Sequence, residues 1–415
     1  MDTANHPVSR RHNPLYDKVR AFDIPQQLQA QQLYPYFRII ESDQDTSVRI
    51  GGKEVLMFGS NSYLGLTNHP EVKAAAAAAI RKYGTGCAGS RFLNGTLDIH
   101  IELEEALAEF VGKEAAVVFS TGFQVNIGAI PCLLGRHDYL VLDELDHASI
   151  LEGSRLTFAR TVKFRHNDMI ALERILHNIE PGVNILIVVD GIFSMDGDIA
   201  PLPELVRLAA RYGASIMVDD AHALGVIGVE GRGTASHFSL TDETDLIMGT
   251  FSKSLASIGG FIAADRPTIN FIKHQARSLI FSASMSPAAA ASAFAALRVI
   301  QREPARIQQL WNNTHHALQA FHDLGFDTGN TCTPIIPIYV RNNEKTFMLA
   351  NLLLEEGVFV NPITSPAVAE NATLIRFSLM ATHTREQIEQ AIDKIHVMAK
   401  KLDIVGELEP HGPGH

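Results

Sequence analysis

Short, fully apolar segments alternate with helical patterns along much of the chain, and this alternation restricts the fold more than any other feature of the sequence. Six such segments lie between about residues 70 and 265: Val117–Phe119, Tyr139–Leu142, Ile185–Val189, Ile216–Val218, Leu246–Met248 and Gly260–Ala263. Segments that are apolar throughout, rather than at every second position, are typical of parallel strands buried on both faces. We therefore expect an α/β fold in which a mainly parallel sheet is covered by helices on both sides.

A second group of elements follows this sheet. We expect a long alanine-rich helix over about 287–324, a strand at Ile335–Val340, a helix at Glu344–Glu356 and a strand at Leu374–Leu379. Thr384 and Gln387 have the spacing of a capping box, which predicts the start of the last helix. These elements predict a smaller C-terminal α/β domain.

The N-terminal part differs in character from both groups. Residues 1 to about 20 are polar and interrupted by proline, so we expect a loose arm there. Gly51-Gly52 predicts a tight hairpin, because glycine allows a positive φ. The predicted division is an N-terminal arm and hairpin over 1–60, a large domain over 61–295, a small domain over 296–402 and a disordered tail over 403–415.

Composition excludes several classes of function. The formal net charge of −11 argues against a nucleic-acid partner, since such binding depends on neutralising phosphates. Cys87, Cys132 and Cys332 are too few and too widely spaced for a disulfide framework, which favours a reducing compartment. No run approaches the roughly 18 apolar residues of a transmembrane helix, and the start lacks the apolar core of a signal peptide. We expect a cytoplasmic protein in which any contact with the inner membrane is peripheral.

Polar residues follow several predicted strands, at the sheet edge where α/β proteins bind ligands. Asp219 follows one strand, and His222 comes three residues later. Lys253 follows another strand, within the otherwise uncharged segment Gly249–Ser257. Partial burial there would lower the pKa of the lysine and leave a neutral amine able to form a Schiff base. A surface lysine is the alternative.

A Schiff-base lysine with a nearby carboxylate is the pattern that pyridoxal phosphate (PLP) requires, because the carboxylate keeps the pyridine nitrogen protonated and the ring an electron acceptor. Asp219 suits the pyridine nitrogen, and His222 suits the ring hydroxyl. His147 follows its own strand and is expected over the ring face, with a buried structural histidine as the alternative.

The phosphate and a substrate carboxylate need donors of their own. Ser120–Phe123 leads into a predicted helix whose N-terminus would offer backbone NH groups to the phosphate, and Thr250 adds a hydroxyl. Arginine suits a carboxylate better than lysine does, because its planar guanidinium can form two parallel hydrogen bonds to the two carboxylate oxygens. Arg376 stands inside the apolar run Leu374–Leu379, where it binds such a carboxylate or forms a structural ion pair.

Competing motifs are weaker. Gly84, Gly86 and Gly89 match G-x-G-x-x-G but follow a predicted helix rather than a strand, which disfavours a dinucleotide site. Lys253-Ser254 resembles the end of a P-loop, but Ser252 stands where glycine is required. The histidines form no HExxH motif, so we expect no metal site.

Longer segments between about Leu33 and Leu402 match one family. They are Leu33–Arg38, Phe58–Gly65, Tyr83–Thr96, Asp146–Ser149, Phe193–Asp198, Asp219–His222, Gly249–Leu255 and Arg376–His383. On these segments the sequence resembles the alpha-oxoamine synthases, PLP enzymes that condense an amino acid with an acyl-CoA and release carbon dioxide. The resemblance implies PLP-dependent transferase fold type I, with a seven-stranded, mainly parallel sheet in the large domain.

The resemblance also implies roles for individual residues. It makes Lys253 the Schiff-base lysine and Asp219 the partner of the pyridine nitrogen, and it makes Arg376 a mobile clamp for the substrate carboxylate. The other residues that it implicates at the cofactor are Gly122, Phe123, His147, Ser194, His222 and Thr250. Members of the family are homodimers with shared active sites, which would involve Asn61, Ser90 and the loop Ser282–Ser286.

The implied reaction joins L-serine and the long-chain thioester palmitoyl-CoA to give 3-oxosphinganine, CoA and CO2, the first step of sphingolipid biosynthesis. Two alternatives remain open at this point. One is a sister synthase that uses glycine or alanine with a shorter acyl-CoA. The other is a catalytically silent regulatory subunit, which would be free to lose the lysine at position 253.

Overall fold

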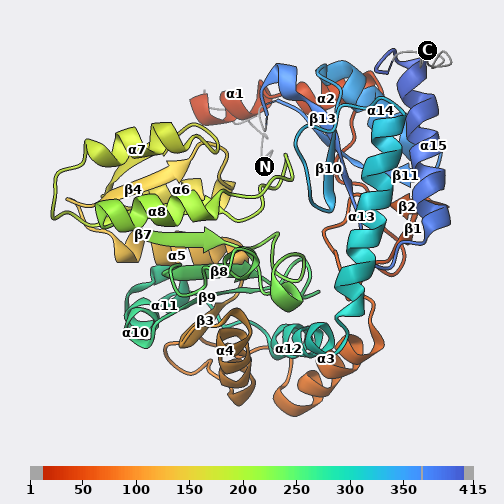
Figure 1. The fold of residues 1–415 in the computed structure, drawn as a ribbon. Coiled ribbons are helices and arrows are strands. Elements are labelled where there is room, and N and C mark those ends of the chain that lie inside the picture. Colours follow the sequence, from red (N-terminus) through yellow and green to blue (C-terminus); the bar gives the residue numbers. More distant parts are fainter. Residues whose placement is uncertain (1–12, 366–367, 406–415) are drawn as a thin grey trace, which may run out of the picture.

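A seven-stranded sheet forms the centre of the larger part of the molecule (Figure 1). The computed structural model describes residues 13–365 and 368–405. In the order β3-β9-β8-β7-β6-β4-β5, the strands are β3 (Ala115–Phe119), β9 (Gly260–Ala264), β8 (Leu246–Thr250), β7 (Ser215–Asp219), β6 (Ile185–Asp190), β4 (Tyr139–Asp143) and β5 (Arg160–Phe164). Strand β9 runs antiparallel to β3 and β8, and the other pairs are parallel. The predicted mainly parallel sheet is confirmed, and all six apolar segments lie in its strands.

The strands are apolar throughout because alternate side chains enter two different cores. Ile187 belongs to the core on one face of the sheet and its neighbour Val188 to the core on the other. The first face is covered by α4 (Asp98–Val111), α7 (Met169–His177), α8 (Leu202–Tyr212) and α12 (Pro287–Arg302), and the second by α5 (Gly122–Leu133), α6 (Ala148–Leu156), α10 (Arg266–Gln275) and α11 (Arg277–Ile280). Both faces of the sheet are therefore closed to solvent, and ligands can approach it only at its ends.

Strand β5 was not predicted, and its pattern explains why. It lies at the edge of the sheet, where Arg160, Thr161 and Lys163 are exposed and Phe164 is buried. Since only Phe164 of this strand is buried, the strand gives no continuous apolar run in the sequence, unlike β3 at the opposite edge.

The C-terminal part carries two small sheets. Strands β10 (Ile335–Tyr339), β13 (Leu374–Ser378) and β12 (Asn361–Ile363) form an antiparallel sheet. Its helices are α13 (Ala305–Asp323), α14 (Asn343–Glu355) and α15 (Arg385–Lys401), and the predicted capping box of Thr384 and Gln387 is present at the start of α15. The predicted βα elements of this part are confirmed.

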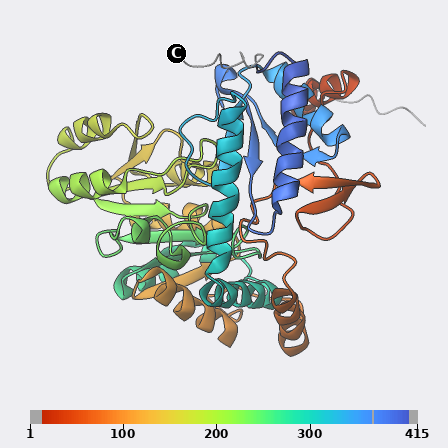
Figure 2. The same ribbon diagram turned by 45° about the vertical axis from the view of Figure 1, so that its right-hand side comes forward.

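The predicted hairpin is present and pairs with a strand from the C-terminal part of the chain. Strands β1 (Ser47–Ile50) and β2 (Lys53–Met57) are antiparallel, and Gly51 and Gly52 between them have positive φ angles of 56° and 75°. Strand β11 (Val358–Phe359) adds to β2 in parallel. Figure 2 shows the hairpin beside α15. The predicted domain limits remain predictions, and α12 crosses the limit placed at residue 295.

Two predictions about helices are wrong. The helix expected over 287–324 is broken into α12 and α13, because Glu303 leaves the helical region (φ −121°, ψ 62°) ahead of Pro304, which has no NH to donate. The loose arm is wrong for its described part, where α1 (Pro14–Arg20) is followed by α2 (Ile24–Ala30). Asn13 caps α1 and Pro14 occupies its first turn, a position that proline favours.

The remaining described elements are α3 (Pro70–Tyr83), the short helix α9 (Thr234–His237) and the two 3₁₀ turns Val229–Gly231 and Glu370–Ala372. No helix within residues 13–365 and 368–405 is long and apolar enough to cross a membrane. Residues 1–12 of the predicted arm and 406–415 of the predicted tail lie outside the described residues.

Candidate active site

A cavity of about 550 Å³ opens at the carboxyl ends of β4, β6, β7 and β8. Ten of the predicted site residues line it: Asn61, Gly122, Phe123, His147, Ser194, Asp219, His222, Thr250, Lys253 and Arg376. They come from the large sheet, from the loop before α3 and from β13 of the small sheet. The cavity thus lies where the two parts of the chain meet.

Lys253 is half-buried in the wall of this cavity. Loss of hydration lowers the pKa of its amine to about 8, and the positive charge of Arg376 acts in the same direction. The carboxylates of Asp219 and Asp190 oppose the shift by favouring the charged amine. The result is an amine that is partly neutral, and therefore nucleophilic, near physiological pH. The alternative of an ordinary surface lysine is not what the structure shows.

Asp219 is held as a hydrogen-bond acceptor at the end of β7. Its side chain is buried, and it accepts from the Asn126 amide (2.7 Å) and from the backbone NH of Ala221 (3.0 Å). The same Asn126 amide also donates to Ser149 Oγ at 2.9 Å. Donors on both carboxylate oxygens hold the side chain in one orientation, as an acceptor, which is the role that the partner of a pyridinium nitrogen requires.

His147 belongs to the same chain of hydrogen bonds. Its Nδ1 lies 2.8 Å from Ser149 Oγ and accepts from the backbone NH of Ser149 (3.2 Å). Because Nδ1 accepts, the proton of a neutral ring sits on Nε2. Burial lowers the pKa of His147, and the charge of Lys253 adds to the shift. His147 therefore offers a neutral Nε2–H donor rather than a cation, and the side chain is exposed where it lines the cavity.

His222 and Arg376 are linked through Tyr63, a residue to which the sequence gave no role. Arg376 Nη2 donates to Tyr63 Oη (3.1 Å), so the hydroxyl proton of Tyr63 is free to be donated to His222 Nδ1 (2.7 Å). This direction fixes the proton of neutral His222 on Nε2. Burial lowers the pKa of His222 well below its usual value, and the charges of Lys253 and Arg376 add to the shift.

Arg376 is 4% exposed and its protein partners are neutral. Besides Tyr63, it donates to the Ser194 carbonyl oxygen (2.8 Å) and to Asn61 Oδ1 (2.8 Å). Within the described residues it forms no ion pair, so the structural ion pair considered for it is wrong. A buried guanidinium without a carboxylate partner favours an anionic ligand in the adjoining cavity.

The N-terminus of α5 forms another wall of the cavity. Thr121 caps this helix by accepting from the NH of Gln124 (3.1 Å), and Thr250 Oγ1 lies beside Ser252 Oγ (3.1 Å). Strand β9 approaches closely here, since a Cβ at Gly260 would stand 2.7 Å from the Cα of Gly122. The approach keeps the helix N-terminus and the two hydroxyls at one place, which is the donor set that a phosphate requires.

These groups together fit PLP. The cavity offers a nucleophilic amine at Lys253, a carboxylate at Asp219, a helix N-terminus at Gly122 and a hydroxyl at Thr250. An aldehyde, a pyridine nitrogen and a phosphate are the three parts of PLP that such groups bind.

One predicted residue lies elsewhere. Ser90 is half-buried in the loop between α3 and α4 and does not line the cavity, and neither does the segment 282–286. The two segments contact each other, because Ser284 NH donates to the Gly89 carbonyl (2.9 Å). The roles that the resemblance gave them concern a second subunit.

Sequence reasoning also missed residues that the site uses, namely Tyr63, Asn126, Ser149, Asp190 and Ser252. Asn126 had a signal, since it is a fully buried amide in an otherwise apolar stretch of α5. Asp190 had one as well, since it follows an apolar strand as Asp219 does. Tyr63, Ser149 and Ser252 are of types that are common outside functional sites.

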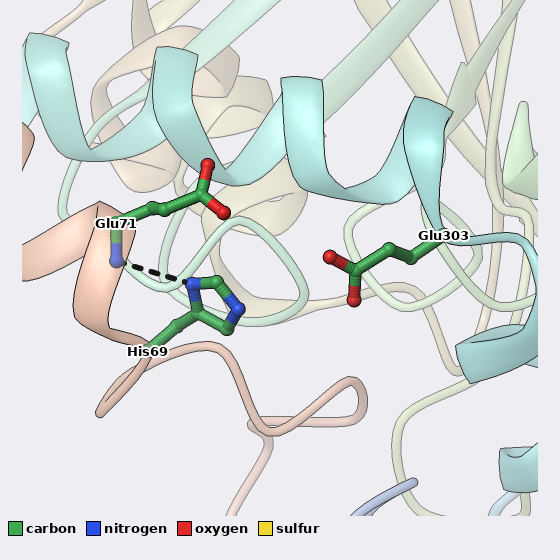
Figure 3. Close-up of side chains that lie close together, drawn as sticks. All are labelled: His69, Glu71 and Glu303. Carbon is green, nitrogen blue, oxygen red and sulfur yellow. Dashed lines mark hydrogen bonds between the residues drawn. The ribbon is translucent and has the colours of Figure 1, made fainter.

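A separate group of possible metal ligands lies at the ends of α3 and α12. His69, Glu71 and Glu303 are close together there (Figure 3). Both carboxylates already have cationic partners, since Arg302 binds both oxygens of Glu71 (2.6 and 3.2 Å) and Arg306 pairs with Glu303 (2.7 Å). The first pair connects α3 to α12 and the second connects the end of α12 to α13, and we assign no metal to the group.

Comparison with known proteins gives consistent results. The family model described as aminotransferase class I and II matches residues 53–395. A serine palmitoyltransferase of Sphingobacterium spiritivorum is 58% identical over 94% of this chain and 98% of its own length. An 8-amino-7-oxononanoate synthase of Thermoanaerobacter pseudethanolicus is 40% identical over 92% of this chain and 96% of its own length. The solved structure of a serine palmitoyltransferase from S. paucimobilis, with bound PLP and myriocin, has a TM-score of 0.92 and 33% identity, covering 95% of this chain and all of that one.

The lowered pKa of Lys253 predicts a distinctive pH dependence of labelling. Below a pH of about 8 the amine is protonated and unreactive, and above it the amine is neutral, so the rate of modification should rise with a midpoint near 8. Trinitrobenzenesulfonate labelling of the cofactor-free protein, followed by peptide mass mapping, measures this midpoint. The other lysines in the same digest are the reference, and Lys253→Ala identifies the peptide. A midpoint near the value of about 10.4 for a free lysine would contradict the predicted environment.

Proposed function

We propose, because the chain belongs to the aminotransferase class I and II family and to its alpha-oxoamine synthase branch, that it condenses L-serine with palmitoyl-CoA. The products are 3-oxosphinganine, CoA and CO2, and the reaction begins sphingolipid biosynthesis. Relatives that are 57–58% identical over 94% of this chain are serine palmitoyltransferases. The observation that carries the proposal is a buried, unpaired Arg376 in the same cavity as an amine with a pKa of about 8.

The cofactor is PLP, and the residues that would hold it are those described above. Lys253 would bind it covalently, Asp219 would face the pyridine nitrogen, His222 the ring hydroxyl and His147 the ring face. Gly122, Phe123 and Thr250 would hold the phosphate, with Ser194 near the ring. When bound, PLP accepts electron density from the α-carbon of the amino acid and makes that carbon nucleophilic toward a thioester.

Binding of serine relies on two donors of different charge. The guanidinium of Arg376 supplies the positive charge for the carboxylate, and Asn61, Tyr63 and the Ser194 carbonyl fix its direction. His147 adds a neutral Nε2–H donor, which orients the carboxylate without adding a second charge. Because Arg376 has only neutral partners, it can turn toward the substrate without breaking an ion pair.

Proton transfer at the α-carbon falls to Lys253. With a pKa of about 8, its free amine can take the α-proton of serine and return a proton to the product. Asp219 stabilises the ammonium that forms, which lowers the barrier to this transfer. A lysine with an ordinary pKa would be protonated at neutral pH and unable to act as a base.

Two alternatives were left open by the sequence: a sister synthase and a silent regulatory subunit. The 8-amino-7-oxononanoate synthases among the relatives are 40–43% identical to the chain, so a sister synthase is less well supported than one that uses serine. A silent regulatory subunit is disfavoured because Lys253, Asp219 and His147 converge on one cavity.

We also propose a homodimer in which a second copy completes each active site. Ser90 and the segment 282–286 lie together outside the cavity of their own chain. The neighbouring side chains are unusually exposed for apolar residues, at 78% for Leu93, 50% for Phe92 and 74% for Phe281. A second copy covering this surface would bury these side chains.

A peripheral contact with the inner face of a membrane is the remaining proposal, and it places the protein in the cytoplasm. Leu15 and Val19 lie one turn apart on α1 and are 66% and 61% exposed, and Lys18 and Arg20 follow on the same helix. Apolar side chains beside basic ones favour anionic lipid surfaces. All three cysteines are free thiols, as in proteins of a reducing compartment.

A substrate panel tests the function. Protein with PLP, L-serine and acyl-CoAs of graded length should form 3-oxosphinganine from palmitoyl-CoA, identified by mass. Lys253→Ala should lower kcat by about a thousandfold or more, because it removes both the covalent link and the base. Lys400→Ala, at an exposed residue of α15, is the matched control and should keep its activity. Product from glycine or alanine in place of serine would identify a sister synthase, and a protein that does not change in absorbance with PLP would identify a silent subunit.

The homodimer is tested by its mass and by one surface variant. Sedimentation should give twice the chain mass of 45.4 kDa. Leu93→Asp should give a monomer with about a hundredfold lower activity, since a charge at the buried centre of an interface opposes association. Ile170→Asp, which is 75% exposed on α7, is the control and should remain dimeric. A fully active monomer would refute the shared site.

Membrane contact is tested by vesicle flotation. The wild type should float with phosphatidylglycerol vesicles, and Leu15→Ser with Val19→Ser should reduce the bound fraction by about fivefold or more, because each buried apolar side chain contributes about 1.5–3 kcal/mol. Ile170→Ser is again the control. Equal flotation of the double variant and the wild type would exclude α1 as the contact.

A further inference from the structure

A histidine outside the cavity lies between two carboxylates. His166 Nδ1 is 3.0 Å from Asp143 Oδ1, and its Nε2 is 2.8 Å from Asp198 Oδ2. The side chain of Asp143 is 1% exposed, and those of His166 and Asp198 are each 21% exposed. Since both ring nitrogens face acceptors, both donate, and the ring is an imidazolium. Burial by itself lowers the pKa of His166, but hydrogen bonds to Asp143 and Asp198 outweigh burial and raise it to about 10.

The neighbouring Asn167 completes the cluster. Its backbone NH donates to Asp143 Oδ2 (2.9 Å), and its side-chain amide donates to Asp198 Oδ2 (2.8 Å). The ring of Phe193 packs edge-on against His166, with the centroids 4.4 Å apart. One cation and one amide thus fix two carboxylates that come from different loops, and none of these side chains lines the cavity.

One of the two carboxylates leads to His147. Asp143 ends β4 and begins the turn 143–147, in which its backbone NH donates to Asp146 Oδ2 (2.9 Å). Asp146 Oδ1 accepts from the NH of Asp190 (3.0 Å), and Asp190 Oδ2 accepts from the NH of His147 (2.8 Å). Position and direction of the His147 backbone therefore depend on the turn that His166 anchors.

The other carboxylate leads to Arg376. Asp198 closes the loop 193–198, since its carbonyl accepts from the NH of Phe193 (3.0 Å). The next residue in this loop, Ser194, presents the carbonyl that accepts from Arg376 Nε (2.8 Å). Residues in and next to β10 of the small sheet bind the same loop. Thr333 Oγ1 donates to the Gly197 carbonyl (2.8 Å), and Tyr339 Oη donates to Asp196 Oδ1 (2.7 Å). The loop is thus held from both parts of the chain.

We infer that His166 is a positioning residue for the substrate carboxylate. By joining Asp143 to Asp198 it holds the turn 143–147 and the loop 193–198 at a fixed separation, and so aligns His147 with Arg376. These are the two groups assigned above to the carboxylate of serine, so the inference rests on the proposed function. His166 itself touches neither substrate nor cofactor. A neutral side chain at this position takes the charged donor away from both carboxylates and lets the two loops separate.

The test compares His166→Gln with a histidine in a similar pair elsewhere. His316 lies 3.3 Å from Glu389 and is 27% exposed, so His316→Gln removes a His–carboxylate pair far from the cavity. In the PLP-loaded enzymes, titration of L-serine followed by visible absorbance gives the Kd of serine. His166→Gln should weaken it by about tenfold, which corresponds to about 1.4 kcal/mol, with the KM of palmitoyl-CoA changed by less than about twofold.

Two further measurements separate positioning from stability. Hydrogen exchange of the segment 193–198 should be faster in His166→Gln and unchanged in His316→Gln. In the double variant His166→Gln, Asp198→Asn, an amide pair replaces the ion pair, and the Kd of serine should return to within about threefold of wild type. If His166→Gln does not fold, Asp198→Ala, at a partly exposed residue, is measured in its place with the same expectation.

The inference is overturned by an unchanged Kd of serine in His166→Gln. It is also overturned if affinities for serine, palmitoyl-CoA and PLP fall together with the melting temperature and the double variant restores none of them. Failure of the proposed function looks different: an enzyme that uses glycine or alanine still binds a carboxylate, so the effect of His166→Gln would persist with that amino acid.

Discussion

The placement of a few charges in a poorly hydrated cavity is the constraint on which the rest of the site depends. Lys253 and Arg376 are both positive, and Asp219 and Asp190 are the carboxylates that face Lys253. Burial shifts each ionisable group toward its neutral form, and opposite charges restore part of the charged form. The amine at position 253 ends with a pKa of about 8 because burial, together with the charge of Arg376, outweighs the attraction of the two aspartates. Moving one charge by a few ångströms would change that balance.

Hydrogen bonds with a fixed direction keep the charges in place. The guanidinium of Arg376 can only donate, so it sets the direction of the bond from Tyr63 to His222. Asn126 connects Asp219 to Ser149 and thus to His147. Both histidines are consequently neutral donors with known tautomers, and Arg376 is left as the buried cation for a substrate anion. His166 extends the same principle outward, since it fixes the loops on which His147 and the Ser194 carbonyl stand.

Much of the fold was predictable from the sequence, because elements that are buried on both faces have continuous apolar segments. The six apolar strands were found because each contributes to the cores on both faces, whereas β5 was missed because Phe164 is its only buried residue. The helix over 287–324 was predicted as continuous because its alanine-rich pattern outweighed Pro304. Tyr63 and Ser149 were not assigned roles, since a single tyrosine or serine is common in any sequence.

The sequence by itself determined the α/β class, the identity of the amine, the carboxylate and the arginine, and the family to which they belong. Those features are local, because a strand, its end and the residue that follows it are adjacent in the chain. Tertiary structure alone decided which partners these residues meet. Arg376 and Asn61 are 315 positions apart, so only the docking of the small sheet on the large one shows that Arg376 has neutral partners. The same docking decides the proton position of His222, because Arg376 of β13 orients the Tyr63 hydroxyl that donates to it. The charge of His166 also depends on the tertiary structure, because its partners Asp143 and Asp198 come from different segments of the large part.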